Sequence, residues 1–374
     1  MKFLHTADWQ IGMKATHVGS VGEKVREARL ESLKRVIEAA NEQRVDFIIA
    51  AGDCFENNAV SRVLVQKTTD IIARAQMPVF IIPGNHDPFV PGSVWDHPAW
   101  TAMKDVTIVS EEKPISVTGC KLLATPVREK HSDRDPTNWM RGDVECITLG
   151  VAHGTVEGVV VEEPDYPIDR DAVVRRGLDY LALGHWHSTA LYASPEGINR
   201  MAYSGTHETT KFGERDSGNA LIVEIAKKGA APLVTTIKTG ILEWLSLVQE
   251  IRMEGDLAVL REQVQSIKNA ERVLLDLKIQ GVYPAQDADE ILRVQELIDA
   301  RFLYGRLDIS QAFLNPDEAL FIESLPAGVI RTAAERLVQL TSPEYHTGRP
   351  DGVTPTVATR ALLELYAIAQ EVRR

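Results

Sequence analysis

Blocks of apolar and polar residues follow one another along the first third of the chain. Near-continuous apolar runs cover residues 2–7, 45–51 and 79–82, and such runs are typical of strands covered on both faces of a sheet. Between these runs, residues 23–41 and 61–75 carry apolar side chains at helical spacing. Strands that alternate with helices predict a parallel sheet with helices on its faces, as in layered α/β domains.

Beyond this region the pattern becomes mainly that of strands. Residues 88–104 contain three Pro and two Trp without clear periodicity, so we expect a long, partly ordered loop there. Short strand-like segments follow at 106–109, 115–117, 121–124, 147–152, 178–183, 190–194, 200–204 and 219–225. The pattern therefore predicts a first domain over residues 1–235 that begins β-α-β and ends in a mainly β half.

From about residue 240 the pattern changes again, to a small α/β unit without clusters of ligand-type residues. Its expected strands and helices are, in order, 242–252, 256–269, 273–279, 287–301 and 302–309. We expect a second, smaller domain over residues 240–335. Residues 336–374 have the pattern of a helix, a linker rich in Pro and Gly, and a second helix.

Length and charge narrow the classes of function. A chain of 374 residues is long enough for two domains. Its net charge of −12 argues against a free-standing electrostatic nucleic-acid binder, because phosphate binding depends on Lys and Arg, but leaves room for an enzyme that holds phosphates through metal ions. No apolar run reaches the roughly 18 residues of a membrane span. Since the first residues lack a signal-peptide pattern and the three cysteines indicate no disulfide framework, we expect a cytoplasmic protein.

Side chains suited to metal ligation follow directly after the predicted strands. Asn85, His86 and Asp87 come after an apolar run that ends in Pro83-Gly84. The other candidates stand in similar places and are Asp8, Gln10, Asp53, His153, His185 and His187. Because the carboxyl ends of neighbouring parallel strands share one edge of a sheet, these side chains are expected to converge. Carboxylate, imidazole and amide oxygen together suit borderline divalent metals such as manganese, iron or zinc.

The number of candidates supports two ions, with Asp53 as the natural bridge between them. Two ions roughly 3.5–4 Å apart clamp the attacking and leaving oxygens of a phosphoryl group and generate hydroxide at neutral pH. His86 is the neighbour of the ligand Asn85 and does not easily reach the same ion. It is better placed as a general acid for the leaving oxygen, with Asp87 orienting its ring.

In this order the motifs resemble the calcineurin-like metallophosphoesterase superfamily, which implies a four-layer αββα sandwich. The flanking residues His5–Gly12, Gly52–Phe55, Ser204–Thr206 and Phe212–Glu214 resemble a narrower group, the bacterial SbcD nuclease and its archaeal and eukaryotic counterparts. Members of this group are nucleases of DNA double-strand-break repair. The resemblance of motifs covers residues 1 to about 225, and beyond that it is only architectural.

The resemblance implies a ligand set for two divalent ions, manganese first, with iron, zinc or magnesium as alternatives. One ion would be held by Asp8, Asp53 and His187, and the other by Asp53, Asn85, His153 and His185. His86 would be the catalytic histidine. Gln10 departs from the family, which usually has His there as a ligand of the first metal, and its amide oxygen is a weaker donor. Glu56, where some relatives have His, is a second departure and affects the expected transition-state contacts.

The remaining histidines match no ligand spacing, and we expect them in the core, in loops or on the surface. They are His5, His17, His97, His131, His207 and His346.

The function expected from these observations and the resemblance is a two-metal DNA phosphodiesterase, an exonuclease for which additional endonuclease activity stays open, in which metal-bound hydroxide attacks phosphorus. The resemblance further implies a cap in residues 240–335, an SbcC-like coiled-coil ATPase bound by the helices of residues 336–374, and a homodimer; simple packing is the alternative for those helices. Two other functions stay open. One is a phosphoesterase acting on nucleotides or phosphoproteins, and the other is a weakly catalytic subunit that binds DNA ends for an ATPase.

Overall fold

The computed structural model describes residues 1–158, 165–315, 318–345 and 348–372. The chain divides into two compact units, Met1–Glu243 and Trp244–Arg374. The second unit contains the predicted terminal helix pair and the predicted cap from residue 244 onward, whereas residues 240–243 belong to the first unit. Positions 346–347 and 373–374 of the predicted pair, and positions 316–317 of the cap, lie outside the described residues. Within the described ranges, no helix is long and apolar enough to cross a bilayer.

The described part of the first unit contains two six-stranded sheets. The first has the order β12-β11-β1-β2-β3-β4 and the second the order β5-β6-β7-β8-β10-β9. The first sheet consists of β1 (Lys2–Thr6), β2 (Phe47–Ala51), β3 (Val79–Ile82), β4 (Val106–Ile108), β11 (Asn219–Glu224) and β12 (Leu233–Lys238). The second consists of β5 (Pro114–Val117), β6 (Cys120–Ala124), β7 (Ile147–His153), β8 (Tyr180–Gly184), β9 (Ala190–Ala193) and β10 (Asn199–Tyr203).

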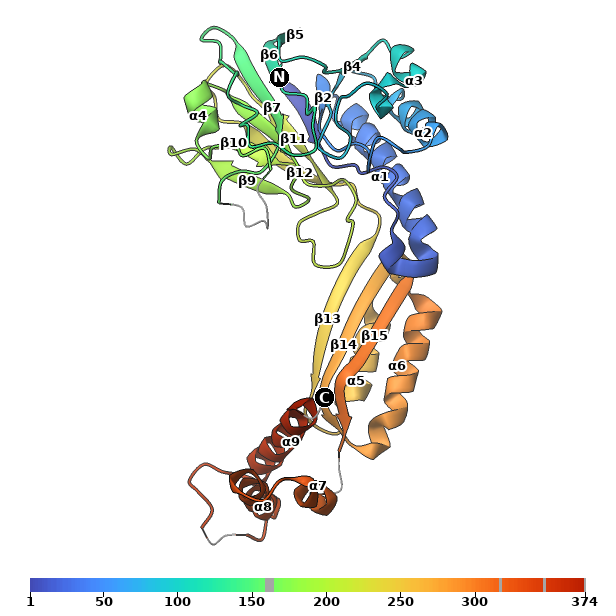
Figure 1. Ribbon diagram of the computed structural model, residues 1–374, viewed down its shortest axis with the longest axis vertical. Helices are drawn as coiled ribbons and strands as arrows, with labels where there is room; N and C mark the ends of the chain where they lie inside the picture. Colours follow the sequence, from blue (N-terminus) through green and yellow to red (C-terminus); the bar gives the residue numbers. More distant parts are fainter. Residues whose placement is uncertain (159–164, 316–317, 346–347, 373–374) are drawn as a thin grey trace. The chain divides into compact units, whose positions relative to one another are not determined.

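The alternation of side chains along each strand explains the layers. In β2, Phe47, Ile49 and Ala51 enter the apolar cluster between the two sheets, whereas Ile48 and Ala50 enter the cluster under the helices. Helices α1 (Gly22–Glu42) and α2 (Arg62–Ile72) cover the first sheet, and α4 (Ala172–Arg176) packs on the outer face of the second (Figure 1). The result is an αββα sandwich, which confirms the predicted fold class.

The strands that carry the predicted ligands are parallel to their neighbours. β1, β2, β3 and β4 run parallel in the first sheet, and β6, β7 and β8 run parallel in the second. Their carboxyl ends therefore open on a common edge within each sheet. On its other side, β1 pairs antiparallel with β11, and this places Phe3 opposite Val223.

The structure adds elements that the sequence pattern did not specify. The loop predicted for residues 88–104 contains two short helical turns, η2 (Val94–Asp96) and α3 (Pro98–Thr101), whose tryptophans pack with Phe55. The strand β12 and the helix α7 (Glu318–Ser324) were not expected at all. β12 lies at the edge of its sheet with mostly exposed side chains, so burial leaves little pattern in its sequence.

The second unit contains a three-stranded sheet, in the order β13-β14-β15, among its described residues. The strands are β13 (Glu243–Ile251), β14 (Val273–Tyr283) and β15 (Tyr304–Leu314), and the helices that cover them are α5 (Asp256–Ser266) and α6 (Ala288–Arg301). Leu275 and Leu277 of β14 pack with Leu260 and Val294 of these helices. A second apolar cluster, which contains Phe321, Ala334 and Leu362, packs α7, α8 (Val329–Thr341) and α9 (Pro355–Val372) together.

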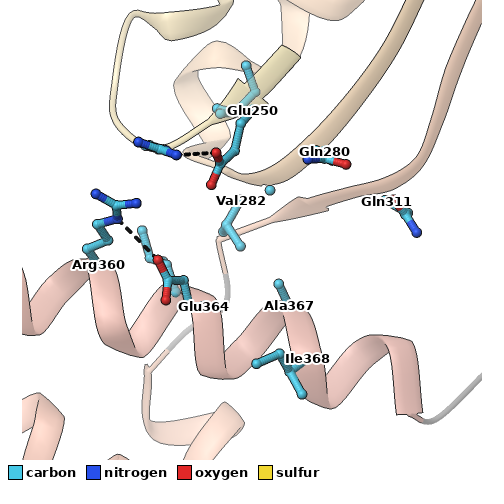
Figure 2. Close-up of a pocket in the computed structure, with 12 residues that line it drawn as sticks. Glu250, Gln280, Val282, Gln311, Arg360, Glu364, Ala367 and Ile368 are labelled. Atoms are coloured by element: carbon cyan, nitrogen blue, oxygen red, sulfur yellow. Dashed lines mark hydrogen bonds and ion pairs between the residues drawn. The ribbon is translucent and has the colours of Figure 1, made fainter. Parts of the chain in front are cut away.

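A cavity of about 260 Å³ lies between the sheet of the second unit and α9 (Figure 2). Two ion pairs line it, Glu250 with Arg252 and Arg360 with Glu364. Solvent-exposed ion pairs of this kind contribute roughly 0–1 kcal/mol each, so apolar packing is the main support of the helices.

Replacing Ile49 by Ala is expected to lower the free energy of unfolding of the first unit by about 2–5 kcal/mol, because the fully buried side chain leaves a cavity between the sheets. Chemical denaturation followed by circular dichroism measures this loss. Leu233→Ala, at a side chain that is 62% exposed on β12, is the control and should change stability by no more than about 0.5 kcal/mol. Equal losses in both variants would contradict the two-sheet core.

Candidate metal centre

The predicted ligands lie where the strands of both sheets end. Asp8 follows β1, Asp53 follows β2 and Asn85 follows β3 in the first sheet. His153 is the last residue of β7, and His185 directly follows β8 in the second sheet. Each sheet therefore contributes ligand-type side chains at the carboxyl ends of its parallel strands.

Two glycines allow the strand ends to approach closely. A Cβ atom on Gly84 would lie 2.1 Å from Oδ1 of Asp53, and one on Gly52 would lie 2.3 Å from Nδ1 of His153. Any side chain at either position would therefore displace a ligand residue. This close approach is the physical reason for the repeated pattern of an apolar run, a glycine and a ligand.

Four of the site residues adopt backbone conformations that L-amino acids rarely occupy. The φ angles of Asp8, Gln10, Asp53 and His185 are 51°, 42°, 51° and 105°. Positive φ at a residue other than glycine costs free energy and persists where the surrounding structure imposes it, often at functional sites. The left-handed backbone at these positions turns the chain so that the side chains point toward the site.

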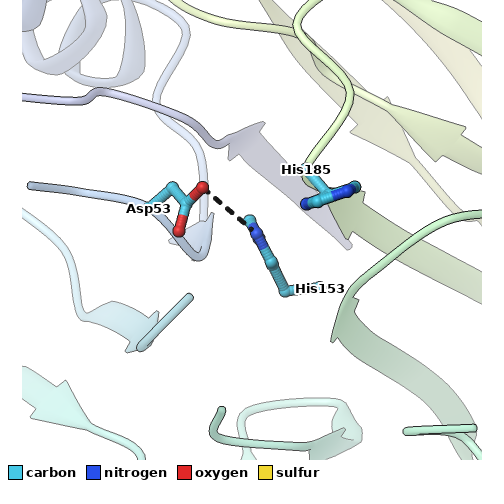
Figure 3. Close-up of side chains that lie close together, drawn as sticks. All are labelled: Asp53, His153 and His185. Carbon is cyan, nitrogen blue, oxygen red and sulfur yellow. Dashed lines mark ion pairs between the residues drawn. The ribbon is translucent and has the colours of Figure 1, made fainter. Parts of the chain in front are cut away.

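The four residues predicted for one of the ions meet at a single point. The ligand atoms of Asp53, His153 and His185 all lie within 4.8 Å of one another (Figure 3). Oδ1 of Asn85 lies 2.8 Å from Nε2 of His153 and 3.2 Å from Nδ1 of His185. Two imidazoles, a carboxylate and an amide oxygen thus form a cluster of the size that surrounds a divalent cation.

The residues predicted for the other ion lie beside this cluster. The carboxylate of Asp8 accepts hydrogen bonds from the main-chain N–H of His185, at 3.0 and 3.1 Å. Nε2 of Gln10 lies 3.1 Å from Nε2 of His187. Rotating the Gln10 carboxamide by half a turn would place its oxygen against the ring instead. Gln10 therefore stands where it could hold an ion next to His187, or hold the ring by a hydrogen bond.

Glu214 is part of the site, although the sequence pointed to it only through the Phe212–Glu214 motif and gave it no role. Its Oε1 lies 2.8 Å from Nδ1 of His187, and its Oε2 accepts a hydrogen bond from the main-chain N–H of Thr210. A carboxylate in this position fixes the orientation of the imidazole and leaves Nε2 for a ligand. Burial alone would raise the pKa of Glu214, but His187 and Thr210 outweigh burial and lower it to about 2.

His86 lies beside the cluster, but Asp87 does not orient it. Nδ1 of His86 lies 3.0 Å from the main-chain oxygen of Glu56, and its Nε2 lies 4.0 Å from Oδ2 of Asp53. Asp87 is fully buried and accepts hydrogen bonds from the main-chain N–H groups of Gly84 and Phe55. The predicted role of Asp87 is therefore wrong. Neighbours in a tight turn point in different directions, and Asp87 ties two strand ends together.

A comparison with family models agrees with this arrangement. Residues 1–189 match the model of the calcineurin-like phosphoesterases. The chain belongs to this family. It is also 27% identical, over 204 residues, to "Uncharacterized metallophosphoesterase YhaO" of Bacillus subtilis. The match covers 50% of this phosphoesterase and 48% of the relative, so the chain spans about half the length of that protein.

Solved structures provide two further comparisons. The protein TT1561 of Thermus thermophilus has a TM-score of 0.42 and 11% identity, and the match covers 64% of this chain and 98% of TT1561. A dimetal phosphatase from Danio rerio, LOC 393393, has a TM-score of 0.40 and 11% identity, with 63% of this chain and 98% of that one covered.

The charges of the phosphoesterase site suit a cation. Burial, together with the charge of His153, lowers the pKa of His185 to about 3, so this ring is neutral and ready to ligate at neutral pH. Burial alone would lower the pKa of His153 as well, but Asp53 outweighs burial and raises it to about 9. Burial raises the pKa of Asp8 to about 6. A cation that binds here must displace the proton of His153, which links metal binding to proton release.

Replacing Gln10 by His is expected to strengthen binding of the ion next to His187, because imidazole is a better donor to transition metals than a neutral amide. Calorimetric titration with manganese measures the affinity for each ion in the wild type and the variant. Gln10→Ala is the matched control and should not gain affinity. Equal affinity for this ion in wild type and Gln10→His would contradict the prediction.

Proposed function

We propose that this phosphoesterase is a two-metal-dependent DNA phosphodiesterase, an exonuclease that acts in double-strand-break repair. The observation that carries the proposal is the grouping of Asp53, Asn85, His153 and His185 with His86 beside them. DNA as the substrate is supported by the SbcD-like motifs around Asp8 and Asp53 and by the second unit, which extends the chain beyond the phosphoesterase core. Since the net charge is −12, basic surface for DNA would come from a partner such as an SbcC-like ATPase.

The residues of the site have distinct roles in this reaction. Divalent ions, when bound, supply Lewis acidity and activated water at neutral pH. Asp53 would be shared between the two groups of ligands, because its buried carboxylate lies 3.3 Å from Nε2 of His153 and also faces His86. Asp8 and His187 would complete one position, with Glu214 holding the His187 ring.

His86 would deliver the proton to the leaving oxygen. The main-chain oxygen of Glu56 can only accept a hydrogen bond, so Nδ1 of His86 carries a hydrogen. The proton that is transferred is therefore the one on Nε2, and the ring acts as an acid in its imidazolium form. Its side chain is 37% exposed, which leaves room for a leaving group to approach.

Gln10 favours a second candidate function. An amide in place of an imidazole weakens one ion position, and a weakly catalytic subunit that binds DNA ends for an ATPase would tolerate this change. A phosphoesterase that acts on nucleotides or phosphoproteins is the third candidate.

The deciding experiment is digestion of end-labelled duplex DNA with manganese, beside hydrolysis of p-nitrophenyl phosphodiesters and with an SbcC-like ATPase present or absent. We expect manganese-dependent shortening of the DNA that stops when EDTA removes the metal. A circular duplex tests for endonuclease activity. Turnover of the small diesters without cleavage of DNA would favour a different phosphoester, and no turnover with tight binding of the ATPase would favour the end-binding subunit.

His86→Ala is expected to reduce DNA cleavage by about 10²–10⁴-fold, the usual contribution of a general acid, because the leaving oxygen loses its proton donor. Manganese binding, measured by calorimetry, should remain, since the predicted ligands are intact. Asp53→Asn is the contrasting variant and should lose both properties. Cleavage by His86→Ala at the wild-type rate would refute the role of this histidine.

A further inference from the structure

A cavity of about 560 Å³ adjoins the metal centre, and two of the predicted ligands, Asn85 and His185, form part of its wall. The rest of the wall comes from outside the predicted ligand set and consists of Glu129, His131, Ser132, Asp133 and Asp165. The sequence led us to expect no site role for His131. Its position in this wall, next to two metal ligands, is not explained by the proposed chemistry.

The far wall of the cavity is held in place by hydrogen bonds. The main-chain N–H of Ser132 donates to Oδ1 of Asp165 at 2.8 Å, and the N–H of Tyr166 donates to the main-chain oxygen of Ser132 at 2.8 Å. The hydroxyl of Tyr166 donates to the main-chain oxygen of Glu129 at 2.8 Å. These hydrogen bonds connect residues 129–132 to residues 165–166 and so fix the position of this wall of the cavity.

One carboxylate oxygen of Asp165 is buried without a hydrogen-bond donor among the described residues. The residue is only 7% exposed, and its Oδ2 is buried and accepts no hydrogen bond from any described residue. A buried carboxylate oxygen without a partner is costly. Nδ1 of His131 lies 3.4 Å away, at ion-pair distance, while 71% of the His131 side chain is exposed. Asp165 therefore favours the tautomer of His131 that has its hydrogen on Nδ1.

In that tautomer of a neutral imidazole, Nε2 is a hydrogen-bond acceptor. The carboxylates of Glu129 and Asp133, which also line the cavity, are acceptors too. A wall of acceptors next to a phosphoester site is complementary to hydroxyl and amino groups. It would repel a second phosphate, because like charges at short distance are unfavourable.

We propose that His131 is a specificity-determining residue, whose Nε2 accepts a hydrogen bond from a hydroxyl or amino group of the nucleoside attached to the scissile phosphate. Asp165 acts as the positioning residue that presents this nitrogen to the cavity. The proposal rests on the proposed function, in that the phosphate is held at the metal centre. According to this proposal, the cavity binds the sugar or base of the substrate. The next phosphate of a nucleic-acid chain would lie outside the cavity, away from its carboxylates.

The test compares two small diesters in the manganese-loaded full chain. The p-nitrophenyl ester of thymidine 5′-phosphate carries hydroxyl and N–H donors, whereas bis(p-nitrophenyl) phosphate carries none. His131→Phe removes the acceptor, and we expect the KM of the thymidine ester to rise about three- to tenfold, as for the loss of one hydrogen bond, with the KM of the other diester nearly unchanged. His17→Phe, at an exposed histidine that does not line this cavity, should alter neither KM.

An unchanged KM for the thymidine ester in His131→Phe, or an equal rise for both diesters, would overturn the proposal. Calorimetric titration with manganese shows whether the variant keeps its metal sites and thus its fold. Digestion of duplex DNA tests the proposed function separately. If the wild type hydrolyses neither diester, the assignment of the cavity is decided by binding alone. Thymidine 5′-monophosphate should bind more weakly to His131→Phe than to the wild type, and equal affinity would overturn the assignment.

Discussion

The close contact between the ends of β2 and β3 is the constraint on which the site depends. Gly84 lies so near Asp53 that a single methyl group would meet the carboxylate, and Gly52 lies equally near the ring of His153. The first contact joins neighbouring strands of one sheet, and the second joins the two sheets. The predicted ligands can therefore meet only because two positions have no side chain and because the backbone tolerates a left-handed turn at Asp53.

Burial then decides what this cluster can hold. Asp8, Asp53 and His153 are almost fully buried, and their charges face one another across a small volume. Without a cation, the cluster balances itself by keeping a proton on His153 beside the carboxylate of Asp53. A divalent cation replaces that proton with a larger charge, so the same low-polarity surroundings that make the bare carboxylates costly favour the ion.

The sequence predicted those parts of the site that have a local pattern. Asp8, Asp53, Asn85 and His185 could be found because each follows an apolar run at a strand end, and the αββα layers follow from the same runs. Glu214 and Asp165 could not be found in this way, because they lie in loops and act on His187 and His131, which are distant in sequence. Asp87 was misjudged because adjacency in sequence says little about direction in a turn. The strand β12 was not predicted, because the side chains of an exposed edge strand show no alternation of apolar and polar residues in the sequence.

The pairing of β1 with β11 has a consequence for synthesis of the chain. β1 is an interior strand of its sheet, yet one of its two neighbours is built from residues 219–224. While a ribosome is still adding the middle of the chain, the edge of β1 is unpaired and able to join other strands. Long-range pairing of this kind slows folding, so this edge of β1 stays open to other strands until residues 219–224 have been synthesised.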